Sequence, residues 1–439
     1  MIPSKAGRVR SITNAIEYLQ ARGCIADSTP RPDLTSYLAK PRTFYCGFDP
    51  TADSLHVGSL AMLMTMRRLQ EFGHKPIAVI GGATGLIGDP SGRDSERPLL
   101  SHEKIEENSL SISAQIKNVL DFSSGISCRA EIVNNIDWCR QVDVITFLRD
   151  IGKNFKISTM LSRECVKSRM GSHSGLTLTE FCYQSLQAFD FFTLSQRYDC
   201  FLQIGGADQW GNIVSGINFI REKLDRKAHG MTVPLIMSKT GAKLGKSTGG
   251  GSVWLCPKKT SPYSLYQYLL NTDDDQVFTL LRMLSPFSLP EIESFQVREA
   301  QVKLAESLTE FVHGEDGLKQ ARSSSQHLFR DDRIDLTKPL DGVPEVRVSA
   351  SAFLQSDLSS LLLVAGIVSS RTEGRRLILA GGVSVNGQRQ DDPKKKLEVD
   401  DLQSDACLIQ IGKRRRFIVR TNTHSPSNLT AVSKSAKSK

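Results

Sequence analysis

The first half of the chain alternates short apolar runs with segments of helical periodicity. Runs at 43–48, 75–81 and 200–206 are rich in apolar residues, which predicts buried strands. Residues 56–72 repeat apolar side chains at i, i+3, i+4 and i+7 and stop at Gly73, which predicts a helix between the first two strands. A second amphipathic helix follows the third run. This rhythm predicts an α/β fold with a Rossmann-like parallel sheet.

The pattern changes after Pro257. Helical segments then follow one another without strands, at 264–271, 274–284, 290–295 and 301–313. Residues 331–348 contain Pro and Asp and are predicted to form a linker. Two short helices, an Asn-Gly hairpin turn and further strands are predicted beyond it, at 354–363, 371–380, 381–388, 408–412 and 416–419.

These changes of pattern predict four regions. They are an α/β domain over 1–257, an α-helical domain with a linker over 258–345, a small α+β domain over 346–420, and a disordered, basic, Ser-rich tail over 421–439.

The bulk properties narrow the class of protein. Lys and Arg number 56 against 47 Asp and Glu, giving a net charge of +9, which suits an RNA partner without requiring one. No apolar run reaches the ~18 residues of a membrane span. The nine cysteines include no Cys-x-x-Cys pair, so we expect neither a protein-bound metal nor a disulfide framework. We also expect the protein to work in a reducing compartment. The first 16 residues carry Lys5, Arg8 and Arg10 and no acid, which fits either a transit peptide or a frayed basic terminus.

The segment after the first predicted strand is a candidate phosphate site. An aromatic run stops at Asp49-Pro50, a polar loop follows, and His56 and Ser59 fall at the start of the helix. Unpaired N–H groups and the helix dipole favour anions there. A capping Ser beside a surface His is the alternative interpretation.

A second segment carries two lysines in a Gly-rich loop. The run from Lys243 through Leu244 and Gly245 to Lys246 and Ser247 nearly matches a Walker A motif. That motif needs Gly at position 240, where the chain has Thr, so we reject a P-loop. A mobile lysine loop far from a His-containing helix start indicates a different kind of nucleotide site.

A third candidate lies on one predicted helix. Tyr183, Gln187 and Asp190 fall at i, i+4 and i+7 and therefore share a face. Phenylalanines surround them, which predicts burial, and buried polar groups need partners. A bound polar amino acid would supply those partners, whereas a solvated helix face is the usual alternative.

Together these motifs resemble the class I aminoacyl-tRNA synthetases. The run from His56 to Ser59 is similar to their HIGH motif, and the run from Lys243 to Ser247 is similar to their KMSKS loop. The whole of residues 16–420 resembles the tyrosyl-tRNA synthetases of the bacterial and mitochondrial type. The resemblance implies activation of L-tyrosine with ATP and Mg²⁺ to tyrosyl-adenylate and pyrophosphate. Transfer of the tyrosyl group to the 3′ end of tRNA(Tyr) would follow, in a homodimer away from any membrane.

The resemblance also implies roles for individual residues. The tyrosine-binding positions are Tyr45, Asp89, Tyr183, Gln187, Asp190, Gln203 and Gln209, with Tyr45 and Asp190 on the substrate phenol. The ATP-binding positions are Cys46, Gly47, Asp49, Thr51, His56, Gly58, Ser59, Gly206, Asp208, Lys243 and Lys246. The groups placed at the reacting phosphates are His56, Arg93, Arg97, Lys243, Lys246 and Ser247. Ser59 departs from the family pattern, because it replaces the second HIGH histidine.

The C-terminal region is similar to the alpha-L RNA-binding module of ribosomal proteins. Its expected RNA-binding residues are Arg375, Arg376, Lys413, Arg414 and Arg415. Tryptophanyl-tRNA synthetase is an alternative that the Tyr45 and Asp190 pair disfavours. A non-catalytic RNA-binding or splicing protein on the same scaffold is another, which the intact lysine loop disfavours. The termini and the two Gly-containing segments at 240–247 and 381–386 resemble mitochondrial members, which favours the mitochondrial matrix over a bacterial cytoplasm.

Overall fold

The computed structural model describes residues 14–92, 96–171, 175–236, 252–330, 336, 343, 345–403, 405–412 and 415–422. The predicted lysine loop and the predicted tail beyond residue 422 lie outside these residues. The chain forms two compact units, one of residues 1–245 and 278–294 and the other of residues 246–277 and 295–439. The four predicted domain boundaries stay a prediction.

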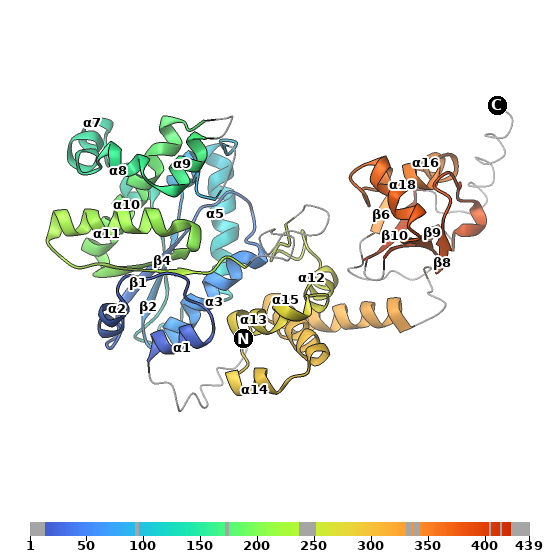
Figure 1. Ribbon diagram of the computed structural model, residues 1–439, viewed down its shortest axis with the longest axis horizontal. Coiled ribbons are helices and arrows are strands. Elements are labelled where there is room, and N and C mark those ends of the chain that lie inside the picture. Colours follow the sequence, from blue (N-terminus) through green and yellow to red (C-terminus); the bar gives the residue numbers. More distant parts are fainter. Residues whose placement is uncertain are drawn as a thin grey trace. The chain divides into compact units, whose positions relative to one another are not determined.

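The first unit is built on a five-stranded parallel sheet with the order β3-β2-β1-β4-β5 (Figure 1). Its strands are β1 (Thr43–Phe48), β2 (Lys75–Ile80), β3 (Glu131–Asn134), β4 (Cys200–Gly206) and β5 (His229–Val233). The prediction of β1, β2 and β4 is confirmed nearly to the residue. The strands are short and mostly buried except β3, whose four residues are all half-exposed and which was not predicted.

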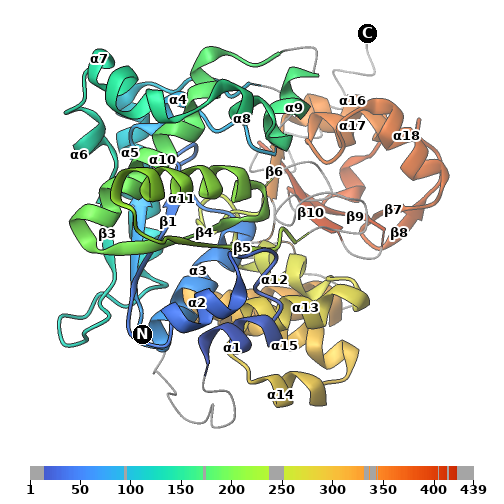
Figure 2. The same ribbon diagram turned by 60° about the vertical axis from the view of Figure 1, so that its left-hand side comes forward.

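Helices cover both faces of this sheet. Three long ones connect neighbouring strands, namely α3 (Val57–Glu71), α5 (His102–Lys117) and α11 (Trp210–Leu224). The connections through α3 and α5 run toward β3 and the connection through α11 runs toward β5. Right-handed crossovers therefore place α11 on the opposite face from α3 and α5 (Figure 2). The long α10 (Leu178–Tyr198) packs against α11 and β4.

Shorter helices complete the first unit. They are α1 (Ala15–Ala21), α2 (Arg31–Tyr37), α4 (Thr84–Ile87), α6 (Ile136–Cys139), α7 (Val144–Thr146), the π-helical turn η1 (Phe147–Ile151), α8 (Ile157–Leu161) and α9 (Glu164–Met170), with the 3-10 turns η2 (Gly152–Asn154) and η3 (Ala207–Gln209). The helix α14 (Leu289–Ser294) and most of α13 (Asp274–Leu284) belong to this unit as well.

The second unit contains the predicted helical region and a second sheet. Its helices are α12 (Pro262–Leu270), α15 (Val297–Arg330), α16 (Ala350–Gln355), α17 (Leu358–Val364) and α18 (Arg371–Leu379). α12 packs along α15, and Gly314 interrupts α15 with φ of 75°. The sheet has the order β6-β10-β9-β7-β8, with β6 (Glu345–Val348), β7 (Val383–Val385), β8 (Gln388–Gln390), β9 (Ala406–Ile411) and β10 (Arg415–Thr421), and the 3-10 turn η4 (Val399–Asp401) precedes β9.

Two predictions in this unit are wrong. The helix expected at 354–363 is two helices, because Asp357 accepts a hydrogen bond from the Ser360 N–H and starts α17 as its N-cap. The end of the expected linker is the strand β6, which pairs with β10 in parallel. The Asn386-Gly387 hairpin turn is confirmed, with positive φ at both residues.

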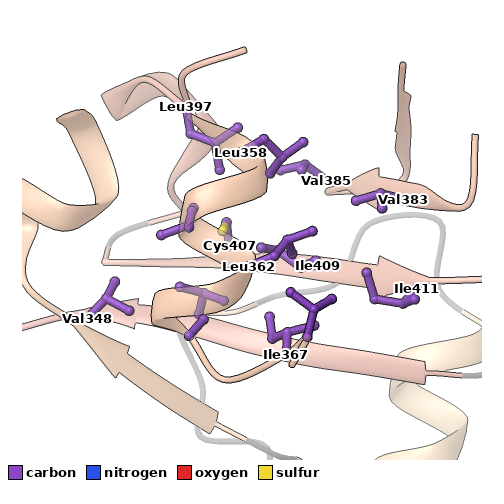
Figure 3. Packing of buried hydrophobic residues seen from close by; sticks show 14 of the residues in the cluster. Val348, Leu358, Leu362, Ile367, Val383, Val385, Leu397, Cys407, Ile409 and Ile411 are labelled. Atoms are coloured by element: carbon purple, nitrogen blue, oxygen red, sulfur yellow. The ribbon is translucent and has the colours of Figure 1, made fainter. Parts of the chain in front are cut away.

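A compact apolar core holds the C-terminal helices on this second sheet. Leu358 and Leu362 of α17 face Val385 and Ile409 of the sheet, and each of these side chains is almost fully buried (Figure 3). This one-sided core leaves the other faces of α17 and α18 to solvent.

Two buried arginines fix the end of α13 to the rest of the first unit. Arg68 of α3 donates to the carbonyls of Arg282, Met283 and Ser285, and Arg22 donates to those of Arg282 and Phe287. The last carbonyls of a helix have no partner within it, so these guanidinium groups satisfy them. Burial lowers the pKa of Arg68.

Arg68→Met is expected to lower the melting temperature by about 6 °C or more, because several buried carbonyls lose their donors at once. The neighbouring Arg67 is a matched control, since its side chain is partly exposed and pairs with Glu71 on the same helix. Arg67→Met should change the melting temperature far less. Equal effects of the two substitutions would contradict the assignment of Arg68 as an anchor.

Candidate active site

The candidate site residues gather where four parallel strands end. Asp49 follows β1, Thr84 follows β2, Asn135 follows β3, and Asp208 and Gln209 follow β4. The strand order reverses between β1 and β4, and ligands of open α/β sheets bind in the crevice at this point.

Asp49, which is half-buried, is the centre of one hydrogen-bonded group. Its carboxylate accepts hydrogen bonds from the Tyr183 hydroxyl at 2.7 Å and the Thr84 hydroxyl at 2.7 Å. A Cβ at Gly81 would lie 2.0 Å from this carboxylate, so only glycine allows the approach. Burial raises the pKa of Asp49 to about 6, although both hydroxyl groups oppose the shift. Tyr183 and Asp49 are therefore a pair that the one-dimensional pattern of α10 does not reveal.

Asp190, which is buried, is the centre of a second group. It accepts the indole N–H of Trp138 at 2.7 Å and the side-chain amide of Asn135 at 3.0 Å. Burial raises the pKa of Asp190 to about 7, while the two donors favour the ionised form. Both donors come from the end of β3 and from α6. The sequence analysis misses them, and two consecutive asparagines after an apolar pair are the signal that could have marked this strand end.

A chain of amides surrounds Asp89. Gln209 donates to the Asp89 carboxylate at 2.7 Å, and Arg97 donates to the Asp89 carbonyl at 3.2 Å. Asn212, another residue that the sequence analysis misses, donates to Gln187 at 2.9 Å and to Gln209 at 3.3 Å. The predicted residues Asp89, Gln187 and Gln209 thus lie in one polar network between α10 and α11.

Two polar atoms of the site are buried without a partner among the described residues. They are the hydroxyl of Tyr45 and the side-chain oxygen of Gln203, which lie opposite each other on β1 and β4. An unpaired buried polar atom costs about 1–3 kcal/mol, so a ligand that pairs with these atoms would recover that energy. Burial raises the pKa of Tyr45, which keeps its hydroxyl a hydrogen-bond donor.

The predicted phosphate side lies next to this pocket. His56 is the N-cap of α3, and its Nδ1 accepts the Ser59 N–H at 3.2 Å, with Gly58 between them. Cys46 and Gly47 lie at the end of β1, Thr51 lies on the loop after it, and Gly206 ends β4. A Cβ at Gly206 would lie 2.6 Å from the Asp208 carboxylate. These positions line the same edge of the sheet as Asp49.

Several predicted residues lie outside the described part of the chain. They are Arg93, Lys243, Lys246, Ser247, Lys413 and Arg414. Of the remaining RNA-binding candidates, Arg375 and Arg376 are exposed on α18. Arg415 differs, because it is half-buried, donates to the Ile367 carbonyl at 2.9 Å and stacks on Phe417. Within the described residues, no group of three or more His, Cys, Asp or Glu side chains could hold a metal ion, and no helix is long and apolar enough to cross a membrane.

Comparison with known proteins identifies the family. The model of the family described as tRNA synthetases class I (W and Y) matches residues 38–330, and the S4 domain matches residues 358–402. The chain belongs to this class I family. Its relatives include the tyrosine–tRNA ligase of Desulfitobacterium hafniense, which is 43% identical over 93% of this chain and 99% of its own length. That of Rhodopirellula baltica is 41% identical over 92% of this chain and 96% of its own length.

A solved structure agrees with this class I synthetase architecture. The C-terminally truncated mitochondrial tyrosyl-tRNA synthetase of Aspergillus nidulans is 28% identical and superposes with a TM-score of 0.64 over 73% of this chain and 95% of its own. The predicted fold, a Rossmann-like sheet followed by helices and a small α+β domain, is confirmed, as is the resemblance to the tyrosyl-tRNA synthetases.

Trp138→Phe is expected to raise the pKa of Asp190 further, because it removes one of the two donors that favour the carboxylate. A carboxyl group ionises as pH rises. The pH at which tyrosine binding reaches half its maximum should therefore move upward, and affinity at pH 7 should fall about tenfold. Equilibrium dialysis with labelled tyrosine between pH 6 and 8.5 measures both. Loss of affinity without recovery at high pH would instead indicate a collapsed pocket.

Proposed function

We propose that this chain is a tyrosine–tRNA ligase that forms tyrosyl-adenylate from L-tyrosine and ATP and transfers the tyrosyl group to tRNA(Tyr). The tyrosine carboxylate attacks the α-phosphorus of ATP, a new P–O bond forms, and pyrophosphate leaves. No general base is needed, because the attacking carboxylate is already ionised. The protein has to position the two substrates and stabilise the charge on the leaving group.

The observation that carries this proposal is the buried pair of Asp190 and Tyr45. Asp190 accepts hydrogen bonds from Asn135 and Trp138, and an ionised carboxylate has further lone pairs to accept a phenol O–H. The Tyr45 hydroxyl is buried and unpaired in the described structure. A phenol placed between these groups would satisfy both. Phenylalanine would leave them unpaired, which costs more than its binding gains.

We assign the remaining groups of the site to the two substrates. The carboxylate of Asp89 suits the tyrosine ammonium group, and the carboxylate of Asp49 suits the polar atoms of ATP. The start of α3 with His56 suits the phosphates, because its N–H groups and its dipole favour negative charge. Mg²⁺ enters bound to ATP. The loop lysines, Arg93 and Arg97 are proposed to stabilise the leaving pyrophosphate.

We also propose that the second unit binds tRNA. The match of residues 358–402 to the S4 domain and the exposed Arg375 and Arg376 of α18 support this role. Guanidinium groups exposed on a helix are suited to contact the phosphates of an RNA backbone.

Amino-acid-dependent exchange of pyrophosphate with ATP tests the proposed activation step. We expect exchange with tyrosine and none above background with phenylalanine or tryptophan. Asp190→Asn should lower exchange with tyrosine about a hundredfold, because a charged hydrogen bond to the phenol is lost. Asp199→Asn at the exposed end of α10 is the matched control and should not change exchange. A folded protein that exchanges with none of the three amino acids would favour a non-catalytic RNA-binding function.

A homodimer is proposed as the working form. Large apolar side chains are exposed along one segment of the first unit, at Val144, Ile145, Leu148, Ile157, Leu161, Met170 and Leu178. Monomeric proteins seldom expose so many apolar residues in one segment of the chain, and a second copy would cover them.

Leu178→Asp is expected to convert the dimer to a monomer in sedimentation velocity. Leu178 is 76% exposed at the first position of α10, where a carboxylate suits the helix dipole, so the fold should be kept. Leu379→Asp at the end of α18 is the control, since Leu379 is 61% exposed outside the proposed interface. A dimer that survives Leu178→Asp would move the interface elsewhere.

We propose the mitochondrial matrix as the location of this chain, with a bacterial cytoplasm as the alternative. The basic residues Lys5, Arg8 and Arg10 near its start support the first. The bacterial origin of the relatives named above is compatible with the second.

A further inference from the structure

One face of α5 holds the segment that joins the two proposed ATP contacts, Asp49 and His56. This segment leaves the end of β1 and enters the start of α3. We propose that Asn108 and Gln115 of α5 are positioning residues for ATP binding. The inference rests on the ATP-binding role proposed above for Asp49 and His56.

Asn108 fixes the beginning of the segment. Its side-chain amide donates to the carbonyl of Pro50 at 2.9 Å, directly after Asp49. The side chain is 1% exposed, and its oxygen is buried without a partner among the described residues. An apolar residue would avoid the cost of that unpaired oxygen. We therefore infer that the bond to Pro50 is what this asparagine contributes.

Gln115 fixes the end of the segment. Its side-chain oxygen accepts the N–H of Leu55 at 2.8 Å, and its amide donates to the hydroxyl of Ser54 at 3.0 Å. Leu55 directly precedes His56, the N-cap of α3. The amide of Gln115 thus makes complementary bonds with the residues that set the entry of the chain into α3.

The spacing of the two amides explains why they act together. Asn108 and Gln115 are seven residues apart, which is close to two helical turns, so they project from one face of α5 about 10 Å apart along its axis. They hold the two ends of the segment at that fixed separation. Ile105, one turn before Asn108, packs close to Gly85 of α4 and places the same face of α5 against that short helix.

The consequence for function is a selective effect on ATP. Asp49 and His56 keep their own side chains when the amides are removed, and only the backbone between them is released. Tyrosine is proposed to bind Asp190 and Tyr45, and neither of these side chains hydrogen-bonds to α5 among the described residues. Loss of the amides should therefore weaken ATP binding more than tyrosine binding.

The test uses the full-length protein and tyrosine-dependent pyrophosphate exchange. We expect Asn108→Ala to raise KM for ATP about fivefold and Gln115→Met about thirtyfold, with KM for tyrosine and kcat within about twofold. Gln115→Glu keeps the acceptor for the Leu55 N–H and should recover part of the loss. Asn118→Ala, at the exposed end of the same helix, is the matched control and should change neither KM.

The outcomes separate this inference from the proposed function. Wild-type protein that shows no exchange with tyrosine overturns the proposed function itself. Active wild-type protein with an unchanged KM for ATP in Gln115→Met overturns the positioning role alone. Equal increases of both KM values, together with a lower melting temperature, would assign Asn108 and Gln115 to stability and also overturn it.

Discussion

The structure of the site depends on withdrawing two carboxyl groups from water at the end of a parallel sheet, the half-buried Asp49 and the buried Asp190, while keeping them hydrogen-bonded. Thr84 and Asn135 make this possible together. The Thr84 hydroxyl donates to Asp49 and accepts from the amide of Asn135 at 3.0 Å, and the same amide donates to Asp190 at 3.0 Å. The Asn135 oxygen in turn accepts the Ala83 N–H, which fixes the orientation of the amide. One continuous set of hydrogen bonds therefore joins the proposed phenol and ATP sides of the pocket.

Much of this arrangement could be predicted from local pattern. The strands β1, β2 and β4 are apolar and buried, so each is recognised in the sequence as a short continuous run of apolar residues. The shared face of Tyr183 and Asp190 follows from helical spacing alone, and the burial of both residues is confirmed. Family membership and the class I architecture were also recognisable, because the two motifs lie in the expected order along the sequence.

The rest could not be predicted because it depends on contacts between distant segments. Tyr183 and Asp49 are 134 residues apart, and no local pattern pairs them. Asn135 and Trp138 follow a four-residue, half-exposed strand that is too short to stand out in the sequence. One apolar helical pattern covers two helices, because the Asp357 side chain accepts the Ser360 N–H and starts the second of them. The sequence pattern does not show whether an aspartate caps a new helix or continues the old one.

Selectivity for a hydroxyl-bearing side chain follows from the same burial. A carboxyl group whose pKa is raised to about 7 is ionised only in part at neutral pH, and a protonated Asp190 would lose much of its capacity to accept a phenol O–H. Asn135 and Trp138 counteract this by donating to the ionised form. Residues that never reach the substrate in this scheme thus set how strongly the pocket distinguishes tyrosine from phenylalanine. In the proposed function, the position of β3 at the sheet edge, which brings both donors to Asp190, is therefore as much a determinant of specificity as Asp190 itself.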